Sequence, residues 1–148
     1  MAAHGLKRYP EAKRLLITAD CGGSNGARVR LWKVELQKLA NQTGLTITVA
    51  HHPPGTSKWN RIEHRMFAFI SQNWRGKPRL SHTVIVQLIA ATKTTSGLSI
   101  SCAIDAARYP KGRQVSDAQI EALDIRYDAF HPDWNYSIFP RLNRSTPK

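Results

Sequence analysis

Acidic residues are scarce in this chain of 148 residues, which has 10 Asp and Glu against 22 Lys and Arg. The formal charge of +12 and the pI of about 10.3 favour a polyanionic partner, such as nucleic acid or an anionic membrane surface. Residues 1–100 contain 15 Lys and Arg but 4 Asp and Glu, whereas residues 101–148 contain 7 and 6. The basic charge is therefore concentrated in the first two thirds of the chain.

Cysteines and long apolar runs are also rare. Cys21 and Cys102 are far apart and belong to no Cys-x-x-Cys pair, which excludes a disulfide framework and a zinc knuckle and favours reduced thiols. No apolar run approaches the roughly 20 residues that span a bilayer, and the N-terminus lacks the apolar core of a signal peptide. We therefore expect an intracellular protein without a membrane partner.

Two of the few carboxylates stand at the ends of distinctive segments. Asp20 follows the apolar run 15–19 and precedes a glycine-rich loop, which is typical of a strand that ends in a loop. Glu63 comes shortly after the Pro- and Gly-containing run 53–60, where a helix is expected to begin. Since hard divalent cations prefer oxygen ligands, Asp20 and Glu63 are candidates for a divalent-metal site.

The hydrophobic pattern predicts one α/β domain over 1–148, with a core at about 13–95 and a C-terminal extension at about 98–141. We expect strands at 13–19, 45–50 and 98–104, and helices at 27–41, 60–74, 81–94 and 116–123, with Gly44 and Gly97 closing two of the helices.

Each candidate carboxylate has a purely structural alternative. Asn60 and Glu63 have the spacing of a capping box, in which Glu63 would reach back to the backbone amide of Asn60. Asp20 is equally suited to an Asx-type turn before the glycines. The glycine loop matches neither a Walker loop nor a dinucleotide fingerprint, so we expect a turn that keeps Asp20 accessible.

Basic and aromatic residues flank Glu63 and are candidates for contacts with DNA. Trp59 is expected either to stack on a base or to anchor its loop on the core. The basic side chains are expected either to bind phosphate or to form an ordinary solvated face. The candidate DNA-binding residues are Lys58, Trp59, Arg61, Arg65, Arg75 and Lys77. His51, His52 and His64 lack the spacing of a zinc finger, and one of them is an alternative contact to DNA.

Four segments resemble the DDE transposases of bacterial insertion sequences, specifically the Rhodopirellula-type DDE transposase family. They are 15–26, 51–65 with its block His-His-Pro-Pro-Gly-Thr-Ser-Lys-Trp-Asn, 73–76 and 131–140, and the resemblance covers about 5–141. It implies a ribonuclease H-like (RNase H-like) fold and DNA cleavage and strand transfer in a bacterial cytoplasm. Asp20 and Glu63 match the second and third carboxylates, which would hold two Mg²⁺ or Mn²⁺ ions.

The chain departs from this family at the first carboxylate. The family's first Asp lies on a strand well upstream of Asp20, and the only acid before Asp20 is Glu11. We therefore expect a catalytic domain truncated at its N-terminus, without its first strands, that binds metal poorly and has little strand-transfer activity alone. An exposed sheet edge would then favour weak stability or self-association.

Two other functions stay open on the sequence. The first is an inactive remnant that binds DNA or a full-length transposase. The second is a basic RNA-binding protein that needs neither carboxylate. Replacing Asp20 or Glu63 separates catalysis from both of these binding functions, because catalysis needs both carboxylates whereas binding to phosphate needs neither.

Overall fold

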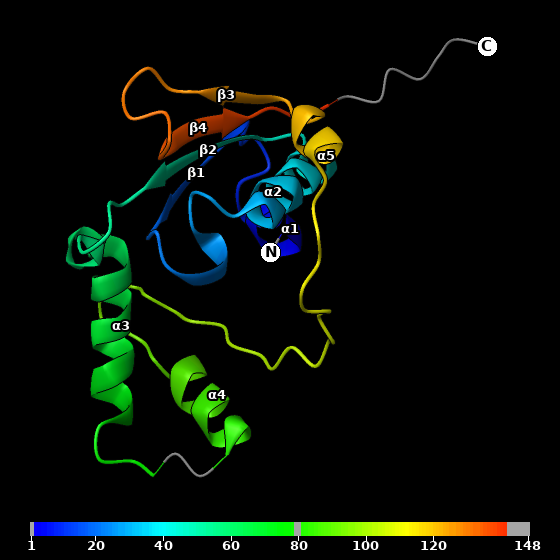
Figure 1. Ribbon diagram of the computed structural model, residues 1–148. Coiled ribbons are helices and arrows are strands. Elements are labelled where there is room, and N and C mark those ends of the chain that lie inside the picture. The colour runs from blue at the N-terminus through cyan, green and yellow to red at the C-terminus, as the bar shows by residue number, and fades with distance from the viewer. Residues whose placement is uncertain (1, 79–80, 142–148) are drawn as a thin grey trace. The chain divides into compact units, whose positions relative to one another are not determined.

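The computed structural model describes residues 2–78 and 81–141 (Figure 1). The chain divides into two compact units. The described part of the first unit consists of residues 2–59 and 112–141, and that of the second consists of residues 60–78 and 81–111. Residues from both ends of the chain thus meet in the first unit, and the second unit is inserted between them in the sequence.

A strand, helix and strand begin the sheet of the first unit. Strand β1 (Arg14–Ala19) lies parallel to β2 (Thr46–His51), with Arg14 opposite Thr46 and Ala19 opposite His51. Helix α2 (Arg30–Thr43) connects them. It ends at Gly44, whose φ of 70° is a left-handed conformation and whose N–H donates to the Ala40 carbonyl, 2.8 Å away. This part of the sequence prediction is confirmed.

The C-terminal region adds two strands that the sequence pattern did not predict. Strand β4 (Asn135–Ile138) pairs antiparallel with β2, and β3 (Ile125–Tyr127) pairs antiparallel with β4, which gives the order β1-β2-β4-β3. These strands have four and three residues, too few for alternation to be distinguished from a loop. Of the predicted extension at about 98–141, residues 112–141 therefore belong to the first unit and supply two strands of its sheet, whereas residues 98–111 belong to the second unit.

The core of this unit lies between α2 and one face of the sheet. Tyr136, Ile138, Ile47 and Val49 are between 0 and 1% exposed, and they pack with two residues of α2, Leu36 and Ala40. Burying apolar side chains from both elements is the main favourable contribution to this packing. Because two of these residues belong to β4, the C-terminal region completes the core.

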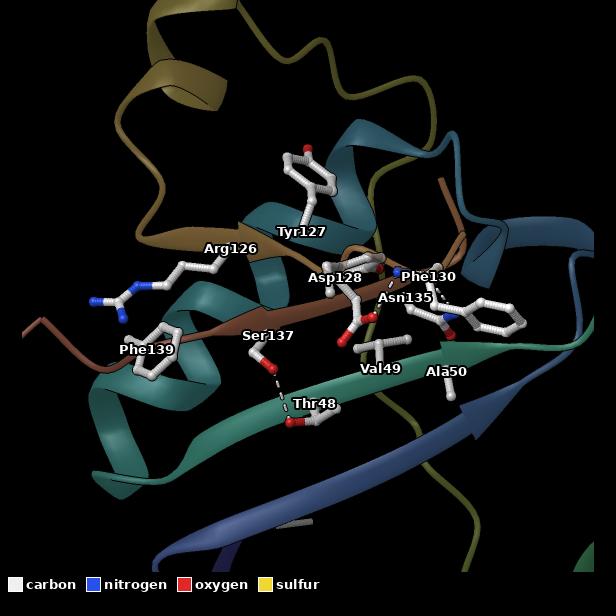
Figure 2. A pocket seen from close by; sticks show the side chains of 11 residues that line it. Thr48, Val49, Ala50, Arg126, Tyr127, Asp128, Phe130, Asn135, Ser137 and Phe139 are labelled. Carbon is white, nitrogen blue, oxygen red and sulfur yellow. Dashed lines mark hydrogen bonds between the residues drawn. The ribbon is translucent and has the colours of Figure 1, made fainter. Parts of the chain in front are cut away.

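The opposite face of the sheet is more polar. An open hollow of about 410 Å³ lies over β2, β4 and β3. Among the side chains that line it are Thr48 and Ser137 (Figure 2), whose hydroxyls lie 2.9 Å apart and share a hydrogen bond. Strand β1 lies at the end of the strand order, and Leu16 on it is 65% exposed. An exposed apolar residue on an edge strand agrees with the expectation of an uncovered sheet edge.

Two short helices complete the first unit. They are α1 (Ala2–Arg8) and α5 (Asp117–Glu121). Ser116 caps α5 in a capping box with Gln119, as the sequence predicted for the start of this helix. Asp117 forms an ion pair with Arg30 of α2 at 2.5 Å. Both side chains are more than half exposed, so this pair contributes little to stability.

The second unit contains helices α3 (Arg61–Trp74) and α4 (His82–Ala90). They are in contact, and the side-chain amide of Asn73 donates to the Leu88 carbonyl at 2.5 Å. The second helix ends four residues before the predicted Thr94, and Gly97 instead closes a turn with Thr94. The strand predicted at 98–104 does not form within these described residues, because the alternating segment has no neighbouring strand to pair with. A single β-bridge joins Lys93 and Ser99 instead.

Among the residues that the structure describes, no helix is long and apolar enough to cross a membrane.

Candidate functional site

Asp20 lies directly after β1, where this strand and β2 end at the same edge of the sheet. Its side chain is half-buried, and its Oδ1 accepts a hydrogen bond from the backbone N–H of Gly22 at 3.4 Å. This contact forms the Asx-type turn expected as the structural alternative for Asp20. The turn fixes the carboxylate at the rim of the sheet and does not conflict with a role in binding a cation.

A buried hydrogen-bonded chain holds the backbone of Asp20. The Asp20 carbonyl lies 3.4 Å from Nδ1 of His51, Nε2 of His51 lies 3.2 Å from the Tyr136 hydroxyl, and Nε1 of Trp32 donates to that hydroxyl at 3.0 Å. Because a carbonyl only accepts, Nδ1 donates, and Nε2 of the neutral ring accepts from Tyr136. The end of β1 is thereby tied to the core.

The surroundings of His51 and Tyr136 favour the neutral forms of both side chains. Burial lowers the pKa of His51, and Lys33 lowers it further, whereas the hydrogen bond to the Asp20 backbone raises it. Burial also raises the pKa of Tyr136 to about 12. His51 is 5% exposed with both ring nitrogens engaged inside the protein. Its ring therefore links the backbone of Asp20 to the Tyr136 hydroxyl in the core.

Glu63 lies in the first turn of α3 and is exposed. The side-chain amide of Asn60, the N-cap residue, donates to Glu63 Oε2 at 2.9 Å, and Asn60 forms no side-chain hydrogen bond to the helix backbone. The capping-box alternative is therefore replaced by a contact between the two side chains. An acidic residue here also interacts favourably with the positive end of the helix dipole. Asn60 thus orients the Glu63 carboxylate.

The two candidate carboxylates belong to different units, Asp20 to the first and Glu63 to the second. Their oxygen donors fit a hard cation such as Mg²⁺. Within residues 2–78 and 81–141, however, no group of three or more His, Cys, Asp or Glu side chains is placed to hold a metal ion. The donor chemistry therefore fits, while the number of ligands within the described residues falls short of a complete site.

The candidate DNA-binding residues are accessible in both units. Trp59 is 61% exposed, which argues against its alternative role as an anchor on the core. It ends a 3-10 helix, Ser57–Trp59, directly before the second unit. The basic candidates are all exposed, namely Lys58, Arg61, Arg65, Arg75 and Lys77. These exposed cations are accessible to phosphate.

The chain thus combines a mixed α/β fold and a formal charge of +12 with two candidate carboxylates, one after a strand and one at the start of a helix. The model of the Rhodopirellula transposase DDE domain matches residues 2–140. The chain belongs to this family of transposase domains, as the resemblance of its segments indicated. Neither the curated proteins nor the solved structures contain a significant match to it.

Proposed function

We propose that this chain is part of an RNase H-like catalytic domain that cleaves DNA and transfers strands during transposition of an insertion sequence. Asp20 and Glu63 supply two of its catalytic carboxylates. The observation that carries this proposal is the position of both residues inside the family match, one after a strand and one in the first turn of a helix. Because the match spans both units, we assign both to one catalytic domain.

The residues around each carboxylate prepare it to bind a cation. The N–H of Gly22 orients Asp20, and the amide of Asn60 orients Glu63, so that neither has to be reorganised on binding. Bound Mg²⁺ or Mn²⁺, two ions in the complete enzyme, supplies activation of the attacking oxygen and neutralisation of charge on the phosphoryl group. A further carboxylate is required, and Glu11 is the only acid that precedes Asp20 in this chain.

The exposed basic residues hold the DNA backbone in this proposal. Arg61 and Arg65 lie on the same helix as Glu63, and Lys58 lies just before it. Arg75 and Lys77 follow the end of that helix. Phosphate contacts of this kind position the substrate without reading its sequence. Trp59 adds a flat apolar surface for a base.

The test is nicking and strand transfer on supercoiled plasmid DNA with Mn²⁺. The chain is compared with Asp20→Asn and Glu63→Gln variants, with Glu121→Gln as a control carboxylate, and with a longer chain that restores an upstream Asp-bearing segment. We expect activity in the longer chain, lost in both site variants and kept in the control, and little activity in the short chain. Activity of the longer chain that survives either site variant would refute these roles.

A second candidate function is supported by the uncovered edge of β1, where Leu15 and Leu16 are 36% and 65% exposed. An open edge strand is a template for pairing with another chain. A non-catalytic chain that binds DNA or a full-length transposase, or that self-associates, would use this edge. Plasmid nicking absent from both chain lengths, together with salt-sensitive DNA binding, would favour this function over catalysis.

The basic RNA-binding alternative makes a different prediction. Competition between duplex DNA and RNA of equal length and charge separates it from the DNA functions. Preference for RNA, unaffected by either carboxylate substitution, would favour it over the proposed function.

A further inference from the structure

A second hollow of the first unit lies at the edge of the sheet that follows Asp20. Its volume is about 680 Å³, within the usual range for small-molecule sites. Cys21 follows β1, Pro54 follows β2, Tyr127 ends β3 and Trp134 precedes β4. Parallel and antiparallel pairing brings all four of these positions to one edge of the sheet. The cavity therefore adjoins the segment that carries a candidate catalytic carboxylate.

Aromatic and cationic side chains line this cavity together. The Lys33 ammonium lies 5.3 Å from the centroid of the Tyr127 ring and donates to its hydroxyl at 3.4 Å. Arg28 is exposed beside it in the lining. Trp134 contributes a half-buried indole, and Asp133 contributes one carboxylate. The lining thus offers a flat surface for an aromatic ring, two cations for an anion, and one acceptor.

The backbone holds Trp134 in place. Its N–H donates to the His131 carbonyl at 2.9 Å, and its own carbonyl accepts from the N–H of His51 at 3.0 Å. The ring of Trp134 also lies 5.3 Å from that of His131, which is the one non-glycine residue with positive φ within the described chain. The fixed backbone and the ring contact with His131 restrict the Trp134 side chain, which lowers the conformational entropy that it loses on stacking.

We propose that this cavity binds one unpaired nucleotide of the DNA substrate. The base stacks on Trp134, the adjoining phosphate interacts with Arg28 and Lys33, and the Asp133 carboxylate accepts a hydrogen bond from an exocyclic amino group. Stacking on an aromatic side chain with basic groups along the backbone is the usual chemistry of single-stranded DNA recognition. A fully paired base cannot enter, so the site selects distorted or unpaired DNA. The inference rests on the proposed function, since it assumes a DNA substrate.

The two cysteines provide a direct readout. Cys21 lines the cavity, whereas Cys102 belongs to the second unit, and both are free thiols. The experiment measures alkylation rates at each cysteine by mass spectrometry, with a short duplex that contains one unpaired adenosine and with the same duplex fully paired. We expect the unpaired adenosine to slow alkylation of Cys21 about tenfold relative to the paired duplex, with Cys102 equal in both.

Variants make the assignment specific. Trp134→Ala should abolish the difference between the two duplexes, and Trp134→Phe should restore most of it, which excludes simple misfolding as the cause. Tyr9→Ala is the control, since Tyr9 is an exposed aromatic residue of the same unit that does not line the cavity, and it should leave the difference unchanged. Arg28→Gln should weaken binding of both duplexes and lower its salt dependence.

The outcomes separate the two proposals. Equal protection of Cys21 by both duplexes, or a difference that survives Trp134→Ala, would overturn the nucleotide site while leaving DNA binding intact. Failure to bind either duplex at low salt would overturn the proposed function and the nucleotide site together.

Discussion

The two units of this protein are built in contrasting ways. The first has a four-stranded sheet and a helix that enclose a common core of fully buried side chains, including Ile47, Val49 and Ile138. Within the described residues of the second unit, Ile70 is the one hydrophobic side chain classed as buried, whereas Ile62 on the same helix is 76% exposed. One unit thus carries its own core, and the other leaves much apolar surface uncovered.

This difference bears on how each carboxylate is held. Asp20 is fixed by strand pairing and by the chain of His51 and Tyr136 hydrogen bonds. Glu63 is fixed locally by Asn60, on a helix with little buried surface of its own. Segments with few buried apolar contacts open at lower free energy than core strands. We therefore expect the Glu63 side of the site to be stabilised by binding to DNA or to another protein segment.

The largest effect should come from removing core volume in the first unit. Ile138→Ala should lower the free energy of unfolding of the sheet by about 2–5 kcal/mol, since it leaves a cavity between α2 and the sheet. Ile70→Ala should change the free energy of unfolding of the sheet by no more than about 0.5 kcal/mol, because Ile70 belongs to the other unit and not to that core. Urea unfolding, monitored by hydrogen exchange of the β2 amides, distinguishes these two variants. Equal losses would mean that the units unfold as one.

The hydrogen bonds beneath Asp20 come next. Tyr136→Phe removes the hydroxyl that Trp32 and His51 share, and should cost about 1–3 kcal/mol because both partners lose a buried hydrogen bond. Tyr127→Phe is the matched control, since Tyr127 is 50% exposed. Thermal unfolding of both variants measures the difference. Equal effects would contradict a specific role for the buried chain.

The pH dependence follows from the lowered pKa of His51. Between the ordinary His pKa of about 6.5 and the lower value in the folded state, the unfolded chain binds more protons, so stability falls as the pH falls through this window. A single group contributes at most about 1.4 kcal/mol per pH unit. His51→Gln should reduce this slope in urea unfolding at a series of pH values. An unchanged slope would assign the effect to other groups.

The helix caps should give the smallest effects. Ser81 accepts from the Val84 N–H at 3.2 Å at the start of α4, and Ser116 accepts from the Gln119 N–H at 3.3 Å at the start of α5. Replacing either serine by alanine should cost about 1 kcal/mol. Hydrogen exchange should show faster opening confined to the second unit for Ser81→Ala and to the first for Ser116→Ala. Changes that spread across both units would contradict their separate stability.

Local patterns in the sequence predicted the elements with strong periodicity. The apolar run before Asp20, the amphipathic α2 and Gly44 gave the parallel pair, and the stripe around Ile70 gave α3. Strands β3 and β4 escaped prediction because β4 depends on pairing with β2, about 90 positions away in the sequence, and β3 depends in turn on pairing with β4. The alternation of Tyr136 and Ile138 around Ser137 was the available signal, but it is very short.

The sequence identified the two carboxylates of the candidate site but not the residues that surround them. Asp20 and Glu63 were found from the scarcity of acids and from the family resemblance. The hydrogen-bonded partners were not predicted, because folding brings these distant segments together: His51 contacts the Asp20 carbonyl, and Tyr136 contacts His51. The cavity around Trp134 was also missed, because it requires β1, β2 and β3 to end, and β4 to begin, on one side of the sheet.

Binding of Mn²⁺ tests the central claim most directly, because it asks whether Asp20 and Glu63 act on one cation. Water-proton relaxation would measure binding to the chain, to Asp20→Asn, to Glu63→Gln, to the double variant and to Glu121→Gln as the control. We predict weak binding that each single site variant removes, that the double variant lowers no further, and that the control retains. Binding that neither site variant changes, or losses that simply add, would contradict a shared metal site.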